Sequence, residues 1–325
     1  MKRLLCFVLA LAALLFALWY YITVPVFFVA SPESYQSLAS ADTLRRHVRT
    51  LSEELPSRSE DADELAASAG YIQAQFQQHT DRVEAQPFGV WGIEYQNISA
   101  KFGPDDDNAP VIVIGAHYDA FKGLPGADDN ASGVAGLLEL ARLFAAQPPP
   151  IQVELVAYAL EEPPYFRTDD MGSFHHAQSL REEGAEVRLM VCLEMIGYFS
   201  EQAGSQRYPL ARLNALYPDK ADFIAVVSNL GGHSDVRALK TGMLQATPLP
   251  VESMLAPAFL AGVDFSDHIN YWFHDYPAVM VTDTAFYRNR AYHTVQDTWD
   301  TLDYERMAMV VDGVYSAVKE LPSSF

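Results

Sequence analysis

The stretch VIVIGAHYD at residues 111–119 decides the fold class of this chain. Its first six residues are apolar on both faces, a pattern typical of a strand buried in the middle of a sheet. The polar residues His117 and Asp119 follow directly at the end of that predicted strand. Because residues i and i+2 of a strand point to the same face, these two side chains should lie together. The stretch therefore predicts a central strand that presents a polar pair at one edge of a sheet.

Strand-like and helix-like segments alternate on either side of this stretch. Further strands are predicted at residues 82–88, 96–102, 153–160, 187–196, 223–228 and 278–282. Helices are predicted at residues 40–55, 59–79, 131–146, 172–183, 235–244, 267–273 and 303–321. Such alternation predicts a three-layer α/β/α domain around a mostly parallel, mixed central sheet. We expect one such domain, covering residues 31–325.

An uncharged apolar segment at residues 4–22 follows Lys2 and Arg3. Its length suffices to cross a bilayer, which takes roughly 20 apolar residues. The two cations favour a cytoplasmic N-terminus, so we expect a membrane anchor at residues 1–30 and a domain on the extracytoplasmic side. A cleaved signal peptide, which would leave the domain secreted, is the alternative. The length of the apolar run favours the anchor.

The composition excludes several classes of protein. The chain has 325 residues, of which 42 are acidic and 22 basic, giving a net charge of −20. This excess of acid argues against a general phosphate-binding surface, so we expect no nucleic-acid partner. Half of the residues are hydrophobic, which argues against disorder. Cys6 and Cys192 cannot build a disulfide framework, and we expect both to be unpaired.

Histidine and carboxylate side chains follow several of the predicted strands. Glu161 and Glu162 come after one apolar run, Glu194 lies within another, and His293 follows a loop after the last strand. In open α/β sheets, ligands bind beyond the carboxyl ends of the strands. Histidine and carboxylate ligands without cysteine suit zinc or another divalent metal. The pattern therefore predicts a metal site at one edge of the sheet.

Each of these motifs also has an ordinary structural interpretation. A His-x-Asp pair and a Glu-Glu pair are common on protein surfaces, and the polar segment 126–133 could simply cap a helix. Glu194 is harder to explain in this way, because a carboxylate inside an apolar strand is costly unless it is paired or ligating. The regular occurrence of all of them at strand ends favours the metal site.

Together, the motifs resemble those of the M28 family of zinc aminopeptidases and their carboxypeptidase-like relatives. The resemblance runs from about residue 96 to residue 307 and rests on AHYD at 116–119, GADDNASG at 126–133, EE at 161–162, LEMIG at 193–197 and YHT at 292–294. It implies two zinc ions. One would be held by His117, Asp129 and Glu194. The other would be held by Asp129, Glu162 and His293, so that Asp129 bridges the two.

The resemblance also implies roles for residues beside the ligands. Glu161 would be the general base, Asp119 would orient His117, and a cis peptide would follow Asp129. The chain departs from the family pattern at Glu194, where aspartate is usual, and the longer side chain is expected to shift the first metal. A second departure is the inserted loop at residues 163–170, which is expected to reshape the substrate entrance.

Further residues are predicted around this centre. Tyr287 is a candidate donor to the oxyanion of a tetrahedral intermediate, with a packing role as the alternative. Asp267 is expected to support the metal ligands from behind. Met195, Trp272 and Phe286 are candidates for an apolar substrate pocket, and two of the three are expected to belong to the core instead.

The sequence thus predicts an exported, membrane-anchored di-zinc aminopeptidase that acts on peptides with a free N-terminus. A metal-bound hydroxide would attack the first peptide bond after Glu161 has taken the proton of the water. A glutaminyl cyclase of the same fold, with a single working zinc, is the alternative. A carboxypeptidase, in which Arg288 or Arg290 would bind the terminal carboxylate, and a non-catalytic relative are less favoured.

Overall fold

A computed structural model describes residues 2–27, 29, 32–55, 57–106 and 109–321. Residues 30–31, where the sequence places the boundary between anchor and domain, lie outside the described residues. That boundary therefore stays a prediction.

The core of the domain is an eight-stranded sheet with the order β1-β2-β4-β3-β5-β8-β6-β7. Its strands are β1 Val83–Val90, β2 Ile93–Phe102, β3 Val111–His117, β4 Gln152–Tyr158, β5 Val187–Glu194, β6 Ile224–Ser228, β7 Val251–Leu255 and β8 Ala278–Thr282. The four central strands β4, β3, β5 and β8 run parallel to one another. Strands β1 and β2 on one side, and β6 on the other, pair antiparallel with their inner neighbours. The predicted mixed sheet with a parallel centre is confirmed.

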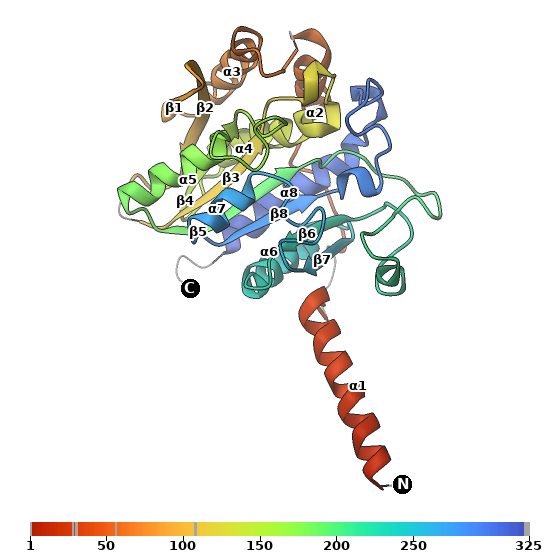
Figure 1. The fold of residues 1–325 in the computed structure, drawn as a ribbon. Helices are drawn as coiled ribbons and strands as arrows, with labels where there is room; N and C mark the ends of the chain where they lie inside the picture. Colours follow the sequence, from red (N-terminus) through yellow and green to blue (C-terminus); the bar gives the residue numbers. More distant parts are fainter. Residues whose placement is uncertain (1, 28, 30–31, 56, 107–108, 322–325) are drawn as a thin grey trace.

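Helices cover both faces of this sheet (Figure 1). They are α2 Ala41–Arg49, α3 Ala62–Phe76, α4 Gly133–Ala146, α5 Gly172–Glu183, α6 His233–Ala246, α7 His268–Phe273 and α8 Tyr304–Glu320. Helices α4, α6 and α8 share one hydrophobic core with one face of the strands. Helices α5 and α7 share a second core with the opposite face. Each strand of the centre is therefore buried on both sides, as the apolar runs predicted.

Strand β7 is the element that the sequence did not predict. Its five residues, VESML, alternate between buried and half-buried positions, and Glu252 interrupts the apolar pattern. The strand forms because it pairs in parallel with β6, from Ile224 opposite Val251 to Ser228 opposite Leu255. This long-range pairing left no signal in the local sequence.

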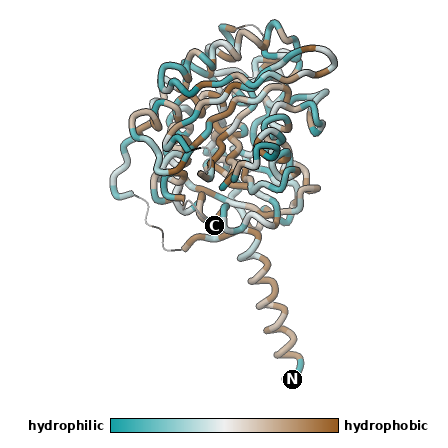
Figure 2. The backbone as a smooth tube through the Cα atoms, turned by 90° about the vertical axis from the view of Figure 1, so that its left-hand side faces the viewer, coloured by the Kyte–Doolittle hydropathy of each residue, from teal (hydrophilic) through white to brown (hydrophobic). Residues whose placement is uncertain are grey.

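Helix α1, Lys2–Thr23, projects away from the domain (Figures 1 and 2). It is long and apolar enough to cross a membrane, and its leucine and phenylalanine side chains are largely exposed. Its far end packs against the domain, where Thr23 and Val24 are buried. Cys6 on this helix and Cys192 in β5, both among the described residues, form no disulfide.

Candidate metal centre

The candidate metal centre lies at the carboxyl ends of the four parallel central strands. His117 is the last residue of β3 and Glu194 the last residue of β5. Glu161 and Glu162 follow β4 after two residues, and His293 lies in the long loop beyond β8. Because these strands are adjacent and parallel, their ends meet at the same edge of the sheet. The side chains predicted from strand ends are thus brought together in space.

Two groups of three ligand-type side chains form there and share one carboxylate. In the first, His117 Nε2 lies 3.4 Å from Asp129 Oδ1 and 3.4 Å from Glu194 Oε2. In the second, His293 Nε2 lies 3.1 Å from Asp129 Oδ2 and 3.2 Å from Glu162 Oε2. Asp129 therefore directs one oxygen to each group, which is the arrangement of a bridging ligand.

Unpartnered polar atoms test whether a metal fits this site. Among the described residues, the Nε2 atoms of His117 and His293 and the Oε1 atom of Glu162 are buried without a hydrogen-bond partner. Buried polar atoms without partners are costly and rare in native proteins. Imidazole and carboxylate groups are the donors that zinc and related divalent ions accept. The residues therefore fit two metal ions, one per group.

The electrostatics of the protein without metal lead to the same conclusion. Burial alone would lower the pKa of His117, but the carboxylates of Glu161 and Glu194 raise it well above its usual range. Burial would likewise lower the pKa of His293, whereas the nearby carboxylates of Asp129 and Glu162 raise it to about 9. The negative charge of the surrounding carboxylates stabilises the protonated, positively charged form of both imidazoles. Metal ions would supply that charge instead.

Asp119 supports both sides of the centre. Its two carboxylate oxygens accept the backbone N–H groups of Glu161 (3.1 Å) and Glu162 (2.9 Å). Its backbone carbonyl oxygen lies 3.2 Å from His117 Nδ1, which leaves Nε2 to face the carboxylates. Fixing the tautomer and the orientation of a ligand histidine in this way strengthens its binding to a metal. Besides the role predicted for it next to His117, Asp119 therefore also positions the backbone of Glu161 and Glu162.

The turn that carries Asp129 is held from two directions. The carboxylate of Asp297 accepts the N–H groups of Asp128 (3.0 Å) and Asp129 (3.1 Å). On the other side, the amide of Asn130 donates to the carbonyl of Leu193 (2.8 Å), next to Glu194. The peptide bond between Asp129 and Asn130 is cis, as the resemblance implied. These bonds place the shared carboxylate between the two histidines.

Glu194 and Asp267 lie on the inner side of the first group. Ser266 Oγ donates a hydrogen bond of 2.7 Å to Glu194 Oε2. Asp267 is fully buried behind this contact, and neither of its carboxylate oxygens has a hydrogen-bond partner among the described residues. Burial raises its pKa to about 7, while the nearby His117 lowers it. Asp267 therefore adds to the electrostatics of the site from behind the ligands.

Glu161 lies beside the first group but outside both. Its Oε2 atom is 3.9 Å from His117 Nε2, and the residue is buried. Burial, reinforced by the neighbouring Glu162 and Glu194, raises the pKa of its carboxyl well above the usual range. A buried carboxyl group that lies beside the ligands but belongs to neither set is suited to proton transfer.

Two tyrosines lie near the centre: Tyr287, which the sequence reasoning selected, and Tyr292, which it did not. The hydroxyl of Tyr287 donates to the carbonyl of Ala261 (3.0 Å). The ring of Tyr292 stacks on His293 with centroids 3.8 Å apart. Burial raises the pKa of Tyr292, and the nearby carboxylates of Asp129, Glu162, Glu161 and Glu194 raise it further. The sequence feature that points to Tyr292 is its position directly before His293.

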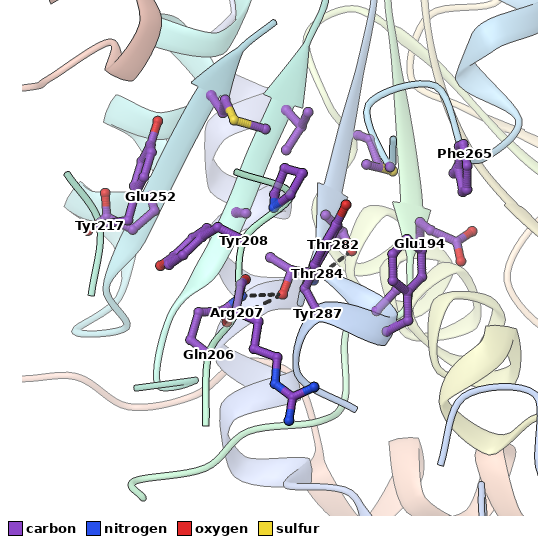
Figure 3. A pocket seen from close by; sticks show the side chains of 18 of the residues that line it. Glu194, Gln206, Arg207, Tyr208, Tyr217, Glu252, Phe265, Thr282, Thr284 and Tyr287 are labelled. Carbon is purple, nitrogen blue, oxygen red and sulfur yellow. Dashed lines mark hydrogen bonds between the residues drawn. The ribbon is translucent and has the colours of Figure 1, made fainter. Parts of the chain in front are cut away.

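A pocket of about 770 Å³ opens beside Glu194 (Figure 3). Phe286 lines it, as predicted from the sequence. Met195 and Trp272 do not line it, which corrects that prediction. Met195 is fully buried, and the indole N–H of Trp272 donates to the carbonyl of Ala278 (3.0 Å) within the second core. Both therefore pack in the interior.

The inserted loop at residues 163–170 lies against this pocket. Arg167 forms an ion pair with Asp264 and lies over the ring of Phe265, 4.9 Å from its centroid. Phe166 contacts the same ring edge-on, at a centroid distance of 5.4 Å. Since Phe265 lines the pocket, the loop supports one of its walls.

The two arginines considered for a carboxypeptidase site, Arg288 and Arg290, have other environments in the structure. Arg288 is buried, with Nε donating to Gln206 (2.9 Å) and Nη1 to the carbonyl of Phe223 (2.8 Å). Arg290 is exposed and does not line the pocket. Neither presents a guanidinium to the metal centre.

A three-layer α/β/α domain with paired His/carboxylate groups at its parallel strand ends defines a zinc-aminopeptidase-like hydrolase. The chain belongs to peptidase family M28, whose pattern matches residues 97–318. The resemblance seen in the sequence motifs is thereby confirmed.

Relatives of known sequence agree with this assignment. The chain is 51% identical over 285 residues to YfbL of Escherichia coli (strain K12), covering 85% of this chain and 87% of that protein. It is 25% identical over 240 residues to the aminopeptidase YwaD of Bacillus subtilis (strain 168), covering 69% of this chain. The chain spans 45% of the length of YwaD, which is therefore a considerably larger protein.

Solved structures share the fold at low sequence identity. The Legionella pneumophila LapA aminopeptidase matches with a TM-score of 0.68 and 22% identity, over 86% of this chain and 71% of that one. A glutaminyl cyclase of Bacteroides thetaiotaomicron matches with a TM-score of 0.66 and 17% identity, over 89% of this chain and all of that one. At such low sequence identities the likeness establishes the fold alone, so the reaction has to be inferred from the residues of the site.

Proposed function

We propose that this protein is a di-zinc aminopeptidase that removes N-terminal residues from peptides. One observation carries the proposal: two buried groups of ligands share Asp129, and a separate carboxyl group, Glu161, lies beside them. A hydrolase needs such a free proton acceptor next to its metals, because the attacking water must lose a proton. The pocket beside Glu194 gives room for the side chain of the residue that is removed.

His117, Asp129 and Glu194 would hold one zinc ion, and Asp129, Glu162 and His293 the other. When bound, the ions act as Lewis acids that polarise the scissile carbonyl and lower the pKa of a water molecule. Glu161 Oε2 accepts the proton of the attacking water and returns it to the nitrogen of the leaving amine. Tyr292, whose ring stacks on that of His293 with centroids 3.8 Å apart, would donate a hydrogen bond to the oxygen that gains charge.

Glutaminyl cyclase activity is the second candidate, because a cyclase shares this fold over its whole length. Cyclisation of an N-terminal glutamine needs no activated water, and the sequence prediction gave it a single working metal. The two complete groups of ligands favour the peptidase. Metal content and substrate choice distinguish the two reactions.

We further propose that α1 is retained as a membrane anchor and that the domain lies on the extracytoplasmic side. The contacts at the end of α1 support this. Val24 is fully buried, and Ser253 Oγ donates to the carbonyl of Thr23 (2.6 Å). The hydroxyl of Tyr20 accepts a hydrogen bond from Arg237 (3.1 Å). Cleavage of a signal peptide in this region would remove residues that the domain itself packs against.

The hydrolase proposal is tested with the variant Glu161→Gln in zinc-loaded protein. The matched control is Glu183→Gln, the same change at an exposed position. We expect Glu161→Gln to retain two zinc ions per chain, measured by elemental analysis. We expect it to lose about 10²- to 10⁴-fold in kcat on aminoacyl anilides, the range for removal of a general base. The control should hydrolyse at the parental rate, and a chelator should abolish hydrolysis by both.

Undiminished turnover by Glu161→Gln would overturn the assignment of the base. One zinc per chain, together with conversion of glutaminyl peptides to pyroglutamyl peptides and no anilide hydrolysis, would identify the cyclase instead.

A further inference from the structure

The pocket runs straight across four adjacent strands of the sheet. In the registers of the strand pairs, Glu194 lies opposite Thr282, Thr282 opposite Ala225, and Ala225 opposite Glu252. Residues opposite one another in a sheet point to the same face. All four residues line the pocket, so its floor is a row that begins at the metal centre and ends at Glu252 on β7.

The length of this row decides what can fill it. Adjacent strands lie about 4.8 Å apart, so the three steps from Glu194 to Glu252 span about 14 Å. The two residues between them, Thr282 and Ala225, are small and leave the space above them open. The pocket wall is mostly apolar and includes Phe223, Val227, Met280 and Phe265. A branched aliphatic side chain would fill the near end and leave the far end empty.

The far end carries the carboxyl group of Glu252, whose pKa is raised by burial and lowered by the nearby Lys240. Glu252 is half-buried, and within the described part of the chain its carboxylate has no ion pair and no hydrogen bond. Lys240 approaches from α6, but its ammonium donates to Ser253 Oγ (3.0 Å), whose residue alternates with Glu252 on the strand. Asp222 adds further negative charge near Glu252.

One cation also lines the pocket, at a different place. Arg207 is exposed to solvent, and its guanidinium points away from Glu252 (Figure 3). Its backbone N–H is bound to the carbonyl of Tyr287 (3.0 Å), on the opposite side of the pocket from β7. Arg207 therefore leaves the carboxylate of Glu252 free for another positive group.

We propose that this pocket selects peptides whose N-terminal residue is lysine or arginine, with Glu252 as the specificity-determining residue. These side chains combine a long apolar stem, which matches the wall, with a terminal cation, which matches Glu252. A carboxylate at the end of an apolar pocket is costly until a cation pairs with it, so the gain is specific to charged substrates. The inference rests on the proposed aminopeptidase function.

The experiment compares lysyl and norleucyl anilides, which have stems of the same length and differ in the terminal ammonium group. Zinc-loaded protein should cleave the lysyl substrate with at least tenfold higher kcat/KM. In Glu252→Gln, that ratio should fall to about one. A charged hydrogen bond of this kind corresponds to about 10- to 100-fold. Glu84→Gln, the same change at an exposed position of β1, should leave the ratio unchanged.

The outcomes separate this inference from the proposed function. Cleavage of both substrates at equal rates, or an unchanged ratio in Glu252→Gln, would refute the specificity and leave the aminopeptidase intact. If neither substrate is cleaved, the aminopeptidase proposal fails. Calorimetric binding of lysinamide and norleucinamide then tests the pocket alone, and equal affinities would overturn it.

Discussion

At the scale of single residues, three of the five ligand-bearing segments contain a backbone conformation that non-glycine residues rarely adopt. Leu160 before the glutamate pair has φ 63°, Met195 after Glu194 has φ 50°, and His293 itself has φ 56°. Such left-handed residues cost of order 1–3 kcal/mol each and persist where surrounding bonds hold them. Met195, for example, donates its N–H to Asn130 Oδ1 (3.0 Å). Each one turns the chain sharply, which aims the neighbouring ligand into the site.

The two tyrosines lead to a prediction at the same scale. Tyr292→Phe removes the phenol that we propose as the donor beside His293, so we expect kcat to fall about 10- to 100-fold with the metal content unchanged. Tyr287→Phe removes a hydroxyl that is occupied by the carbonyl of Ala261, so we expect less than a threefold change. Steady-state kinetics of both zinc-loaded variants check this. A larger loss in Tyr287→Phe than in Tyr292→Phe would restore the assignment made from the sequence.

At the scale of elements, a buried arginine connects the N-terminal helices to the loops of the metal site. The guanidinium of Arg58 donates to the carbonyl groups of Leu51, Tyr118 and Gly126. Tyr118 lies between His117 and Asp119, and Gly126 begins the turn that carries Asp129. The positive charge of Arg58 therefore lies behind a site that is dominated by carboxylates. The isolated arginine in the sequence carried no sign of this role.

The packing of α2 against α3 predicts how stability depends on pH. His47 on α2 is buried, and its Nδ1 lies 2.6 Å from the hydroxyl of Tyr71 on α3. Burial lowers its pKa to about 4. The unfolded chain takes up a proton at His47 near pH 6.5, whereas the folded chain does so only near pH 4. The free energy of unfolding should therefore fall between these values as the pH is lowered, by up to about 1.4 kcal/mol per unit.

Urea denaturation at pH 7 and pH 5, for the parent and for His47→Gln, checks this prediction. The variant keeps a polar partner for Tyr71 but cannot take up the proton. We expect it to lose clearly less stability than the parent between the two pH values. Equal losses would mean that His47 is not a source of the acid sensitivity.

At the scale of the whole molecule, the apolar helix and the domain are joined by specific contacts. The hydroxyl of Tyr21 donates to the carbonyl of Leu230, and its ring stacks on His233 at a centroid distance of 5.1 Å. The rest of α1 is exposed and apolar along its length (Figure 2). Such a surface is stable in a bilayer and unfavourable in water. The anchor would therefore hold the domain close to the membrane in a defined orientation.

Two truncations test this arrangement. Removal of residues 1–18 deletes the exposed part of α1, so we expect a protein that is soluble without detergent and as stable as the full chain. Removal of residues 1–30 also deletes the buried Val24, so we expect a loss of about 1.5–3 kcal/mol in the free energy of unfolding.

The full-length chain should stay with membranes after washing in high salt, with its intact mass preserved. A soluble product that lacks the first residues would identify a signal peptide instead.

Some of the acidic residues of the chain are concentrated in two places in the folded molecule. Asp119, Asp129, Glu161, Glu162 and Glu194 are gathered at the metal centre, where two zinc ions would offset four negative charges. Glu252 lies at the far end of the pocket, and Asp222 contributes negative charge near it. The net charge of −20, which in the sequence only argued against nucleic acid, is thus partly concentrated where a cationic substrate would bind.

The order of apolar and polar residues along the chain is sufficient to predict the central strands, the layers and a metal site at one edge of the sheet, whereas the individual ligands were assigned through the resemblance to family M28. This succeeds because strands buried on both faces are continuous apolar runs, and a ligand at a strand end is a polar residue at the end of such a run. His117 and Glu194 are found in this way. The predicted ligands were brought together by the parallel registers of β4, β3, β5 and β8.

The pocket could not be predicted in the same way, because its residues are neighbours only across strands. Glu252 lies on β7, which forms by pairing with β6, and it meets the row from Glu194 through registers that no local pattern encodes. The assignment of Met195 and Trp272 to the pocket failed for the same reason, since an apolar residue near a ligand in sequence can point into the core. Ligand identity follows from local chemistry along the chain, whereas the shape and charge of the pocket depend on which strands lie side by side.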